Sequence, residues 1–313
     1  MEINWKDRIL PEYEVRKSAA QKTAFIEMLR SVYGDRMRVE EGGTVVKSRN
    51  IVFGSPETAK IVYTAHYDTC ARLPIPNFIT PRNIFLYLLY QIAVALLFLV
   101  PAFGLEILVG YLTREWAPLP SFLAMEGTLF AVLVFLLWVF LGGVPNPHTA
   151  NDNTSGVVAV LTLADRLAED SDAAFILFDN EEIGLLGSMA YAAAHPEMKK
   201  NTLIVNFDCV SDGDSILVLF SRKAEEMPLY EVLRSRAPAV FGGSGKSVEI
   251  CPKKGTIYPS DQANFKVSAA VCSLNRSKVF GLYMDKIHTP KDIVFDEKNI
   301  TLLTELFAGA VSQ

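Results

Sequence analysis

Two long apolar stretches limit what this chain can fold into more than any other feature. The first runs from Ile84 to Leu112, where Gln91, Pro101 and Glu106 are the only strongly polar or helix-breaking residues, and the second covers residues 127–144. Each approaches the roughly 20 apolar residues that a helix needs to cross a hydrocarbon core of about 30 Å. We therefore expect each stretch to form a helix long enough to span a membrane.

A short polar linker that contains Arg114 and Trp116 separates the two stretches. Such a linker lets two spanning helices form a hairpin, so that the chain enters and leaves the membrane on the same side. The sequence therefore predicts a hydrophobic helical hairpin over residues 81–145. It is inserted into one discontinuous domain that consists of residues 1–80 and 146–313.

A second interpretation of the hairpin stays open. Glu106, Glu126 and the break at Pro101 are compatible with long core helices, or with an apolar lid over a substrate pocket. Helices of globular proteins are usually shorter and seldom apolar on every side. This difference favours contact between residues 84–144 and a lipid bilayer.

The predicted membrane topology rests on the charged residues around the hairpin. The N-terminal segment carries alternating charges and no apolar core, unlike a secretory signal peptide. Arg82 directly precedes the first apolar stretch, and positive charge is enriched on the cytoplasmic side of membrane helices. We expect a membrane protein whose folded domain lies on the cytoplasmic side.

Charge and cysteine usage exclude two classes of function. The formal net charge is -5 and no Lys/Arg-rich run occurs, so a nucleic-acid partner is not expected. The cysteines are widely spaced, without the paired spacing of a zinc knuckle or a redox motif. We expect free, buried thiols at all four positions: Cys70, Cys209, Cys251 and Cys272.

Outside the hairpin, strand-like and helix-like segments alternate along the chain. Helical spacing of apolar residues predicts helices over residues 13–33, 156–167, 184–195 and 299–311. Short β-branched or apolar runs predict strands over residues 44–46, 50–53, 60–65, 173–178, 202–207, 215–220 and 269–274. This alternation predicts an α/β fold of three α/β/α layers, with a mostly parallel mixed central sheet.

Acids and histidines follow several of the predicted strands or begin helices. In an open α/β sheet, the crevice at the carboxyl ends of the strands is where ligands bind. Each position alone is weak evidence, because an acid after a strand is usually a turn or cap residue. Their joint occurrence indicates a site built from His66, Asp68, Asp152, Glu181, Glu182, Asp208 and His288.

Two pairs within this set have spacings that suit a metal site. His66 and Asp68 lie two residues apart in an extended segment, so both side chains leave the same face. An acid there can accept the second ring N–H of a metal-bound imidazole. Glu181 and Glu182 project to opposite sides if the strand conformation persists, so one can bind a metal while the other stays free.

Six strings of the sequence resemble, in order, the co-catalytic di-zinc exopeptidases that include bacterial leucyl aminopeptidase, aminopeptidase Y and aminopeptidase S. The resemblance covers the whole chain except the hairpin. The matching strings are AHYDT (65–69), ANDNTSG (150–156), FDNEEIGLLGS (178–188), NFDCV (206–210), YPSD (258–261) and IHTPKD (287–292).

The resemblance implies a fold and a ligand set. The fold is that of a zinc exopeptidase domain, and Asp152 bridges two zinc ions. The other ligands form two pairs, His66 with Asp208 and Glu182 with His288. Carboxylate-rich sites accept several divalent ions, so zinc is replaceable in this interpretation.

The same resemblance assigns the remaining roles. Glu181 is the general base and Asp68 orients His66. In the mechanism that follows, Tyr258 or a nearby backbone N–H is the candidate to stabilise the oxyanion. A cis peptide bond is expected between residues 152 and 153. The implied activity is that of an aminopeptidase, which removes N-terminal residues from peptide substrates.

Two other outcomes stay open. One is another reaction on the same scaffold, such as carboxypeptidase, dipeptidase or glutaminyl cyclase activity, and another is a non-catalytic module of a membrane complex. The chain also departs from the family pattern: Gln262 follows Ser260 and Asp261 where members commonly have histidine, and typical secreted members lack the hairpin.

Overall fold

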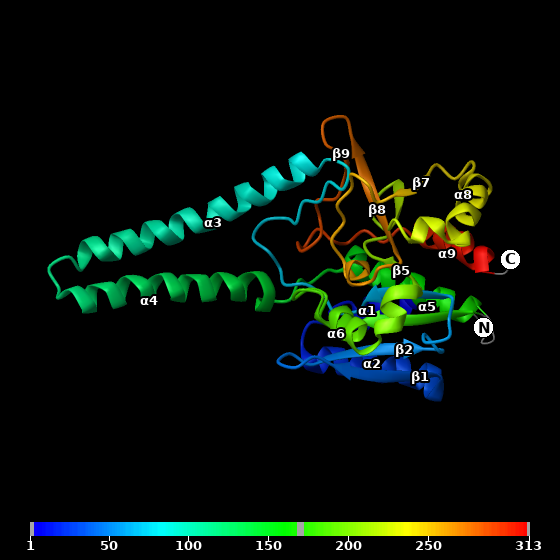
Figure 1. Cartoon of the computed structure of the whole chain (residues 1–313), viewed down its shortest axis with the longest axis horizontal. Helices are drawn as coiled ribbons and strands as arrows, with labels where there is room; N and C mark the ends of the chain where they lie inside the picture. Colours follow the sequence, from blue (N-terminus) through cyan, green and yellow to red (C-terminus); the bar gives the residue numbers. More distant parts are fainter. Residues whose placement is uncertain (1–2, 168–171, 312–313) are drawn as a thin grey trace.

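The computed structural model describes residues 3–167 and 172–311. Within these ranges the chain forms one nine-stranded sheet between two layers of helices, and a long helical hairpin projects from this body (Figure 1). The strands are β1 (Met37–Gly42), β2 (Ser48–Phe53), β3 (Ile61–His66), β4 (Ala173–Phe178), β5 (Leu203–Phe207), β6 (Ser215–Phe220), β7 (Ser247–Pro252), β8 (Ser268–Ser277) and β9 (Gly281–Tyr283).

The sheet has the order β1-β2-β4-β3-β5-β8-β6-β7, and β9 pairs with β8. Its centre is parallel, because β3 pairs in parallel with β4 and β5, and β5 with β8. Antiparallel pairs lie to either side, and β6 and β7 form a further parallel pair. The predicted α/β class with a mixed sheet is confirmed, and its parallel part is the part that carries the site.

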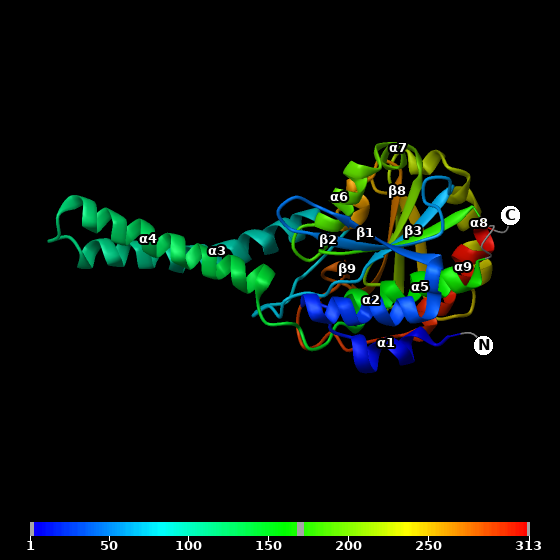
Figure 2. The same cartoon turned by 90° about the horizontal axis from the view of Figure 1, so that it is seen from below.

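Helices cover both faces of the sheet (Figure 2). On one face, side chains such as Phe25, Val157 and Leu303 form a single apolar core with the strands, and on the other face Tyr191 and Met198 pack against them. The first layer consists of α1 (Trp5–Tyr13), α2 (Ala19–Tyr33), α5 (Gly156–Arg166), α8 (Pro228–Phe241) and α9 (Glu297–Val311), and the second of α6 (Leu186–Ala194) and α7 (Pro196–Asn201).

Two local predictions are wrong. The helix expected over residues 13–33 begins only at Ala19, because Ser18 caps α2 with a capping box in which Gln21 hydrogen-bonds back to the cap; the preceding helix α1 was not predicted. The strand expected over residues 44–46 is the turn between β1 and β2, where the Val45 side chain is 93% exposed. A single apolar Val-Val pair does not make a strand when no neighbouring layer covers it.

The hairpin consists of α3 (Ile84–Leu112) and α4 (Pro118–Leu137), and α4 continues into a π-helical turn that ends at Gly142. Both helices are long and apolar enough to cross a membrane, and the most apolar 18-residue windows are only 6% and 0% buried. At 1.5 Å per residue, α3 is about 43 Å long. In both views the hairpin points away from the sheet rather than over it (Figures 1 and 2).

Backbone hydrogen bonds join the base of the hairpin to the segment that follows β3. Where the chain leaves the hairpin, the carbonyl of Val144 accepts from Arg72 N, and Asn146 N donates to the carbonyl of Cys70, at 2.8 and 3.1 Å. An isolated bridge between Ala71 and Pro145 lies between these two bonds. The segment that follows β3 is therefore paired directly with the segment that follows the hairpin.

Candidate metal centre

The central parallel strands bring the predicted site residues to one edge of the sheet. His66 is the last residue of β3, and Asp208 directly follows β5. Glu181 and Glu182 follow β4, and Asp152 precedes α5 on the same side. Because β4, β3 and β5 are parallel neighbours, their carboxyl ends meet, which is why residues more than 100 positions apart converge.

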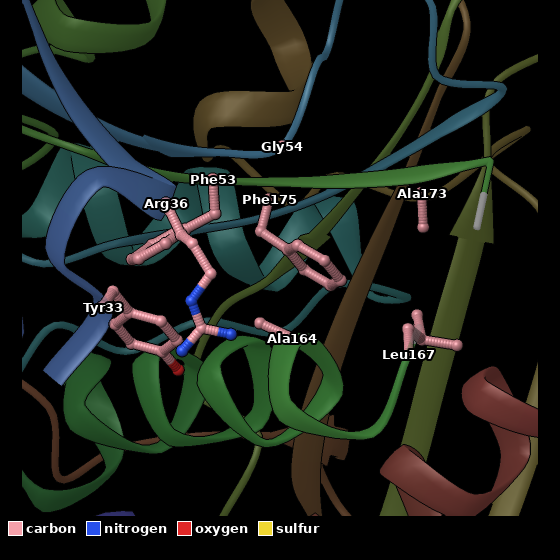
Figure 3. Close-up of a pocket in the computed structure, with 8 residues that line it drawn as sticks. All are labelled: Tyr33, Arg36, Phe53, Gly54, Ala164, Leu167, Ala173 and Phe175. Carbon is pink, nitrogen blue, oxygen red and sulfur yellow. The ribbon is translucent and has the colours of Figure 1, made fainter. Parts of the chain in front are cut away.

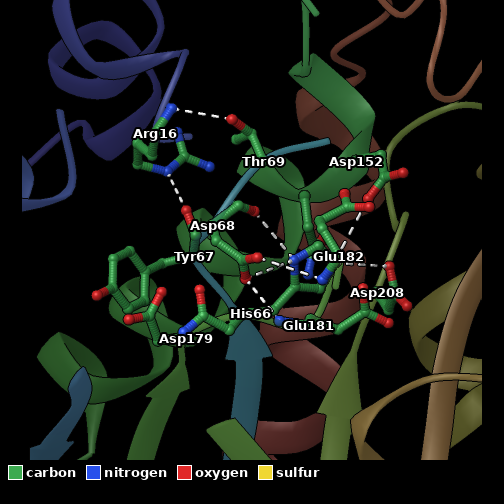
Figure 4. Close-up of polar contacts among 12 residues, drawn as sticks. Arg16, His66, Tyr67, Asp68, Thr69, Asp152, Asp179, Glu181, Glu182 and Asp208 are labelled. Atoms are coloured by element: carbon green, nitrogen blue, oxygen red, sulfur yellow. Dashed lines mark hydrogen bonds and ion pairs between the residues drawn. The ribbon is translucent and has the colours of Figure 1, made fainter. Parts of the chain in front are cut away.

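The His66 ring is oriented with one nitrogen toward carboxylates (Figure 4). Its Nε2 lies 3.4 Å from Asp152 Oδ1 and 3.5 Å from Asp208 Oδ1. Its Nδ1 lies 3.1 Å from the backbone carbonyl oxygen of Asp68. A proton on Nδ1 donates to that carbonyl and leaves the Nε2 lone pair facing the two acids, which is the tautomer that binds a metal through Nε2.

His288 approaches Asp152 from the opposite side, out of the loop that follows β9. Its Nε2 lies 3.2 Å from Asp152 Oδ2 and 3.3 Å from Glu182 Oε2. The two oxygens of Asp152 thus serve two different groups, one with His66 and one with His288. The peptide bond between Asp152 and Asn153 is cis, as the resemblance implies.

These groups suit a divalent cation. Ligand atoms about 2 Å from a zinc ion lie roughly 3.3 Å apart at the tetrahedral angle, and the four distances from the two imidazoles are 3.2–3.5 Å. Glu182 Oε1 is buried without a hydrogen-bond partner among the described residues. Acceptor atoms that face one another at this distance repel unless a cation lies between them.

Electrostatics of the site follow from burial and charge crowding. Burial, with the charges of Asp152 and Asp68, raises the pKa of Glu182 well above its usual range. Burial also raises the pKa of Glu181. For His66 burial acts to lower the pKa, but the surrounding carboxylates overcome this effect and raise it. The acids therefore gain from a cation, and a divalent ion neutralises more of their charge than a proton does.

Asp68 contacts the acidic pair as well as the histidine. Its carboxylate accepts the backbone N–H of Glu181 at 3.0 Å and of Glu182 at 3.2 Å. The same carboxylate lies 3.7 Å from His66 Nδ1, farther than the Asp68 backbone carbonyl. Asp68 thus orients the His66 ring chiefly through its backbone, and its side chain fixes the turn that carries both glutamates.

The comparison with known families decides the class of this protein. Residues 140–309 match the sequence model of peptidase family M28, and this region is more than half of the chain. The chain belongs to peptidase family M28. The predicted metallopeptidase class is thereby confirmed. The narrower leucyl aminopeptidase, Y and S group remains a prediction, as does the insertion of the hairpin.

Solved structures agree with the M28 fold. The LapA aminopeptidase of Legionella pneumophila has a TM-score of 0.51 and 15% identity, over 98% of this chain and 67% of that one. Two glutaminyl cyclases also match, from Porphyromonas gingivalis (TM-score 0.57, 15% identity, 98% and 95% covered) and Fimbriiglobus ruber (0.54, 12%, 98% and 92%). At these identities the likeness establishes the fold. No curated protein sequence matches the chain.

Two residues of this M28 centre were missed by the sequence reasoning. Asp292 is buried, and its carboxylate accepts the backbone N–H of Asn151 at 2.9 Å and of Asp152 at 3.0 Å. Burial, together with the charge of Asp152, raises the pKa of Asp292 to about 8. Asp292 belongs to the same sequence string as His288 (IHTPKD, 287–292), and this was the signal that could have identified it. The second missed residue, Arg16, lies in the break between α1 and α2.

Arg16 joins the N-terminal helices to the metal-binding segment. Its fully buried guanidinium donates to the carbonyl of Tyr67 at 2.5 Å and to Thr154 Oγ1 at 3.1 Å, and its backbone N–H donates to Thr69 (Figure 4). Burial lowers the pKa of Arg16 to about 10, so it stays charged at neutral pH. No sequence pattern marks this residue, because its contacts with Tyr67, Thr69 and Thr154 join segments far apart in the chain.

Replacing Arg16 with alanine is expected to lower the free energy of unfolding by about 2–4 kcal/mol. The change leaves the buried carbonyl of Tyr67 without a donor and removes hydrogen bonds made by a charged group. Urea unfolding of the detergent-solubilised protein measures the effect. The control is Arg30→Ala on α2, where the side chain is 51% exposed and a change within about 0.5 kcal/mol is expected. Equal effects of the two changes would contradict a special role for Arg16.

The loop with Tyr258 and Gln262 lies beside the M28 centre. The Tyr258 side chain is buried, and its hydroxyl donates to the backbone carbonyl of Asp208 at 3.0 Å. Gln262, the residue at which the sequence departs from the family pattern, lies in the same loop. Its amide accepts from Asn206 at 3.1 Å and donates to the carbonyl of Tyr258 at 2.8 Å. Gln262 therefore holds this loop against β5.

A separate pocket of about 230 Å³ lies at the opposite end of the sheet (Figure 3). It opens near the amino end of β4, whereas the metal centre lies beyond the carboxyl end of that strand. The pocket contains none of the predicted site residues. It is lined by Tyr33, Arg36, Phe53, Gly54, Ala164, Leu167, Ala173 and Phe175.

Proposed function

We propose that this protein is a zinc-dependent aminopeptidase that is attached to a membrane by its helical hairpin. The observation that carries the proposal is the shared carboxylate of Asp152. One of its oxygens faces His66 and the other faces His288, within a member of peptidase family M28. Such an arrangement serves two metal ions with one bridging ligand.

The ligand assignment follows the two groups around Asp152. His66 and Asp208 would hold one zinc ion, and Glu182 and His288 would hold the other. Zinc bound here supplies Lewis acidity toward the scissile carbonyl and the attacking water. The orphaned Glu182 Oε1 and the crowded carboxylates are consistent with two divalent ions.

Glu181 is the proposed general base. Its backbone is fixed by Asp68, and its raised pKa suits a group that removes a proton from water and then delivers it to the leaving amine. Tyr258 is the proposed oxyanion donor. To act in this way, its hydroxyl must exchange the carbonyl of Asp208 for the substrate oxygen.

The activity is tested with three matched peptides that differ only at the N-terminus. We expect release of the first residue from the peptide with a free amino end, and at least about 100-fold slower release from its N-acetylated form, because the free amine is part of what an aminopeptidase recognises. Equal rates on both peptides would exclude an aminopeptidase. The third peptide begins with glutamine, and loss of ammonia without cleavage of a peptide bond would indicate a glutaminyl cyclase instead.

We also propose that residues 81–145 are a membrane-inserted hairpin within one discontinuous domain, formed by residues 1–80 and 146–313. The exposed apolar surface of α3 and α4 supports this division, because such a surface requires lipid or a partner to cover it. The positions of Arg82 and Lys17 at the base of the hairpin favour a cytoplasmic catalytic domain.

Trypsin added to intact cells tests this topology at a single bond. Arg114, at the tip of the hairpin, is the only Lys or Arg between Arg82 and Arg166. We expect one cut there, which yields two membrane-bound fragments, while the catalytic domain stays intact until the cells are lysed. An Arg114→Gln variant should remain uncut. Digestion of the domain from outside would reverse the topology, and recovery of the uncleaved protein in the soluble fraction would contradict insertion.

A further inference from the structure

A buried thiol lies among the ligands of the second metal group. The side chains of Cys70, Asp152, Glu182 and His288 each offer one ligand atom, and these atoms all lie within 4.8 Å of one another. Cys70 is fully buried and is not in a disulfide. The imidazole and the two carboxylates of this group have been assigned above, whereas the sulfur has no role in the proposed reaction.

Hydrogen bonds join the segment that carries the Cys70 thiol to the segment that carries the His288 imidazole. Leu73 N donates to the carbonyl of His288 at 2.8 Å, three residues after the cysteine. Asn146 donates from its backbone to the carbonyl of Cys70 and from its side chain to the carbonyl of Thr289, at 3.1 and 2.9 Å. The same short set of hydrogen bonds therefore positions the backbones of Cys70 and His288.

A second observation points to a ligand at this place. The Glu182 side chain is 5% exposed, and its Oε1 makes no hydrogen bond within the described residues, nor does His288 Nδ1. Polar atoms buried in this way are costly unless something binds them. A sulfur, a nitrogen and two carboxylate oxygens form a donor set that suits zinc and other thiophilic divalent ions, and excludes a preference for magnesium or calcium.

We infer that Cys70 is a sulfur ligand of the metal ion held by Asp152, Glu182 and His288. This inference rests on the proposed function, because it requires a metal ion at that site. On binding, the S–H bond breaks, sulfur keeps the electron pair for the bond to the metal, and the proton leaves to the solvent. The two metal positions then differ: the ion beside His66 has only nitrogen and oxygen ligands from the chain, and the other has one sulfur.

Cobalt substitution of the full-length protein in detergent tests the assignment. We expect wild-type protein loaded with Co²⁺ to show a thiolate-to-cobalt charge-transfer band in the near ultraviolet, and Cys70→Ser to lack it. Cys251→Ser is the matched control, because Cys251 lies on β7 against Arg82, and it should retain the band. Loss of outer-sphere partners typically weakens a metal site about 10–100-fold, so loss of a direct ligand should weaken one of the two sites at least about tenfold.

The outcomes separate this inference from the proposed function. Wild-type protein that binds cobalt without the band, or a Cys70→Ser variant that keeps it, would overturn the sulfur ligand and leave the metallopeptidase proposal standing. Wild-type protein that binds no cobalt or zinc would overturn both. Because the serine variant could misfold, cadmium-113 spectra of the wild-type protein give an independent reading: a resonance in the range of mixed sulfur ligation supports Cys70, and oxygen and nitrogen ligation alone contradicts it.

Discussion

Replacing Glu181 with glutamine is expected to slow peptide hydrolysis by about 10²–10⁴-fold and to leave the zinc content unchanged. The change removes a group that accepts and returns a proton, but it keeps the size of the side chain. The backbone N–H of residue 181 still donates to Asp68, so the turn that carries the acidic pair is preserved. Steady-state kinetics and metal analysis of the same sample measure both quantities.

The adjacent carboxylate supplies the control for this experiment. Glu182→Gln is the same chemical change one residue along, and the side chain of Glu182 faces His288. We expect this variant to lose metal from one site together with activity. If Glu181→Gln also lost zinc, Glu181 would be a ligand and the assignment of the general base would have to change.

Replacing Asp152 with alanine is expected to remove both zinc ions and all measurable activity. Each oxygen of this carboxylate faces a different histidine, so a single truncation removes a ligand from both groups. The first group then keeps only His66 and Asp208, and the second loses the carboxylate that it shares with the first, so neither group has its full set of ligands. Metal content per chain, measured after dialysis, should fall from about two to near zero.

Two variants show whether this effect is specific to the bridging position. His288→Ala removes a ligand from one group only and should leave about one zinc ion per chain. Asp214→Asn changes an acid whose side chain is 80% exposed, and it should leave both ions in place. A circular dichroism spectrum shows whether each variant is folded. One ion retained by folded Asp152→Ala protein would show that the two ions do not share this carboxylate.

The sequence was most informative where chemistry and strand order coincide. The strings around His66, Glu181 and Asp208 follow buried apolar runs, and runs of this kind form the parallel centre of the sheet. Parallel strands point their carboxyl ends the same way, so the convergence of these residues could be predicted without coordinates. The helical hairpin was equally readable, since its signal is length and apolar composition alone.

Other features depend on contacts that leave no periodic pattern. The start of α2 is set by one hydrogen-bonded cap at Ser18, although the spacing of Ser18 and Gln21 is a capping-box signal that could have been used. Strand β7 has polar and half-exposed side chains and therefore lacks a strand signature. Arg16 donates to a backbone carbonyl, and Asp292 accepts from backbone N–H groups, of segments that are distant in the chain. Sequence spacing does not reveal these hydrogen bonds.

The hydrogen-bonded connection between residues 70–72 and 144–146 places the chemistry close to the end of the hairpin. Val144, the acceptor from Arg72, lies only two residues beyond the π-helical turn that ends α4. With the hairpin embedded as proposed, the metal centre would lie near the membrane surface. A peptide bound to the same membrane would then be confined to the layer in which the metal centre lies, whereas a soluble peptide would have to arrive from bulk solution.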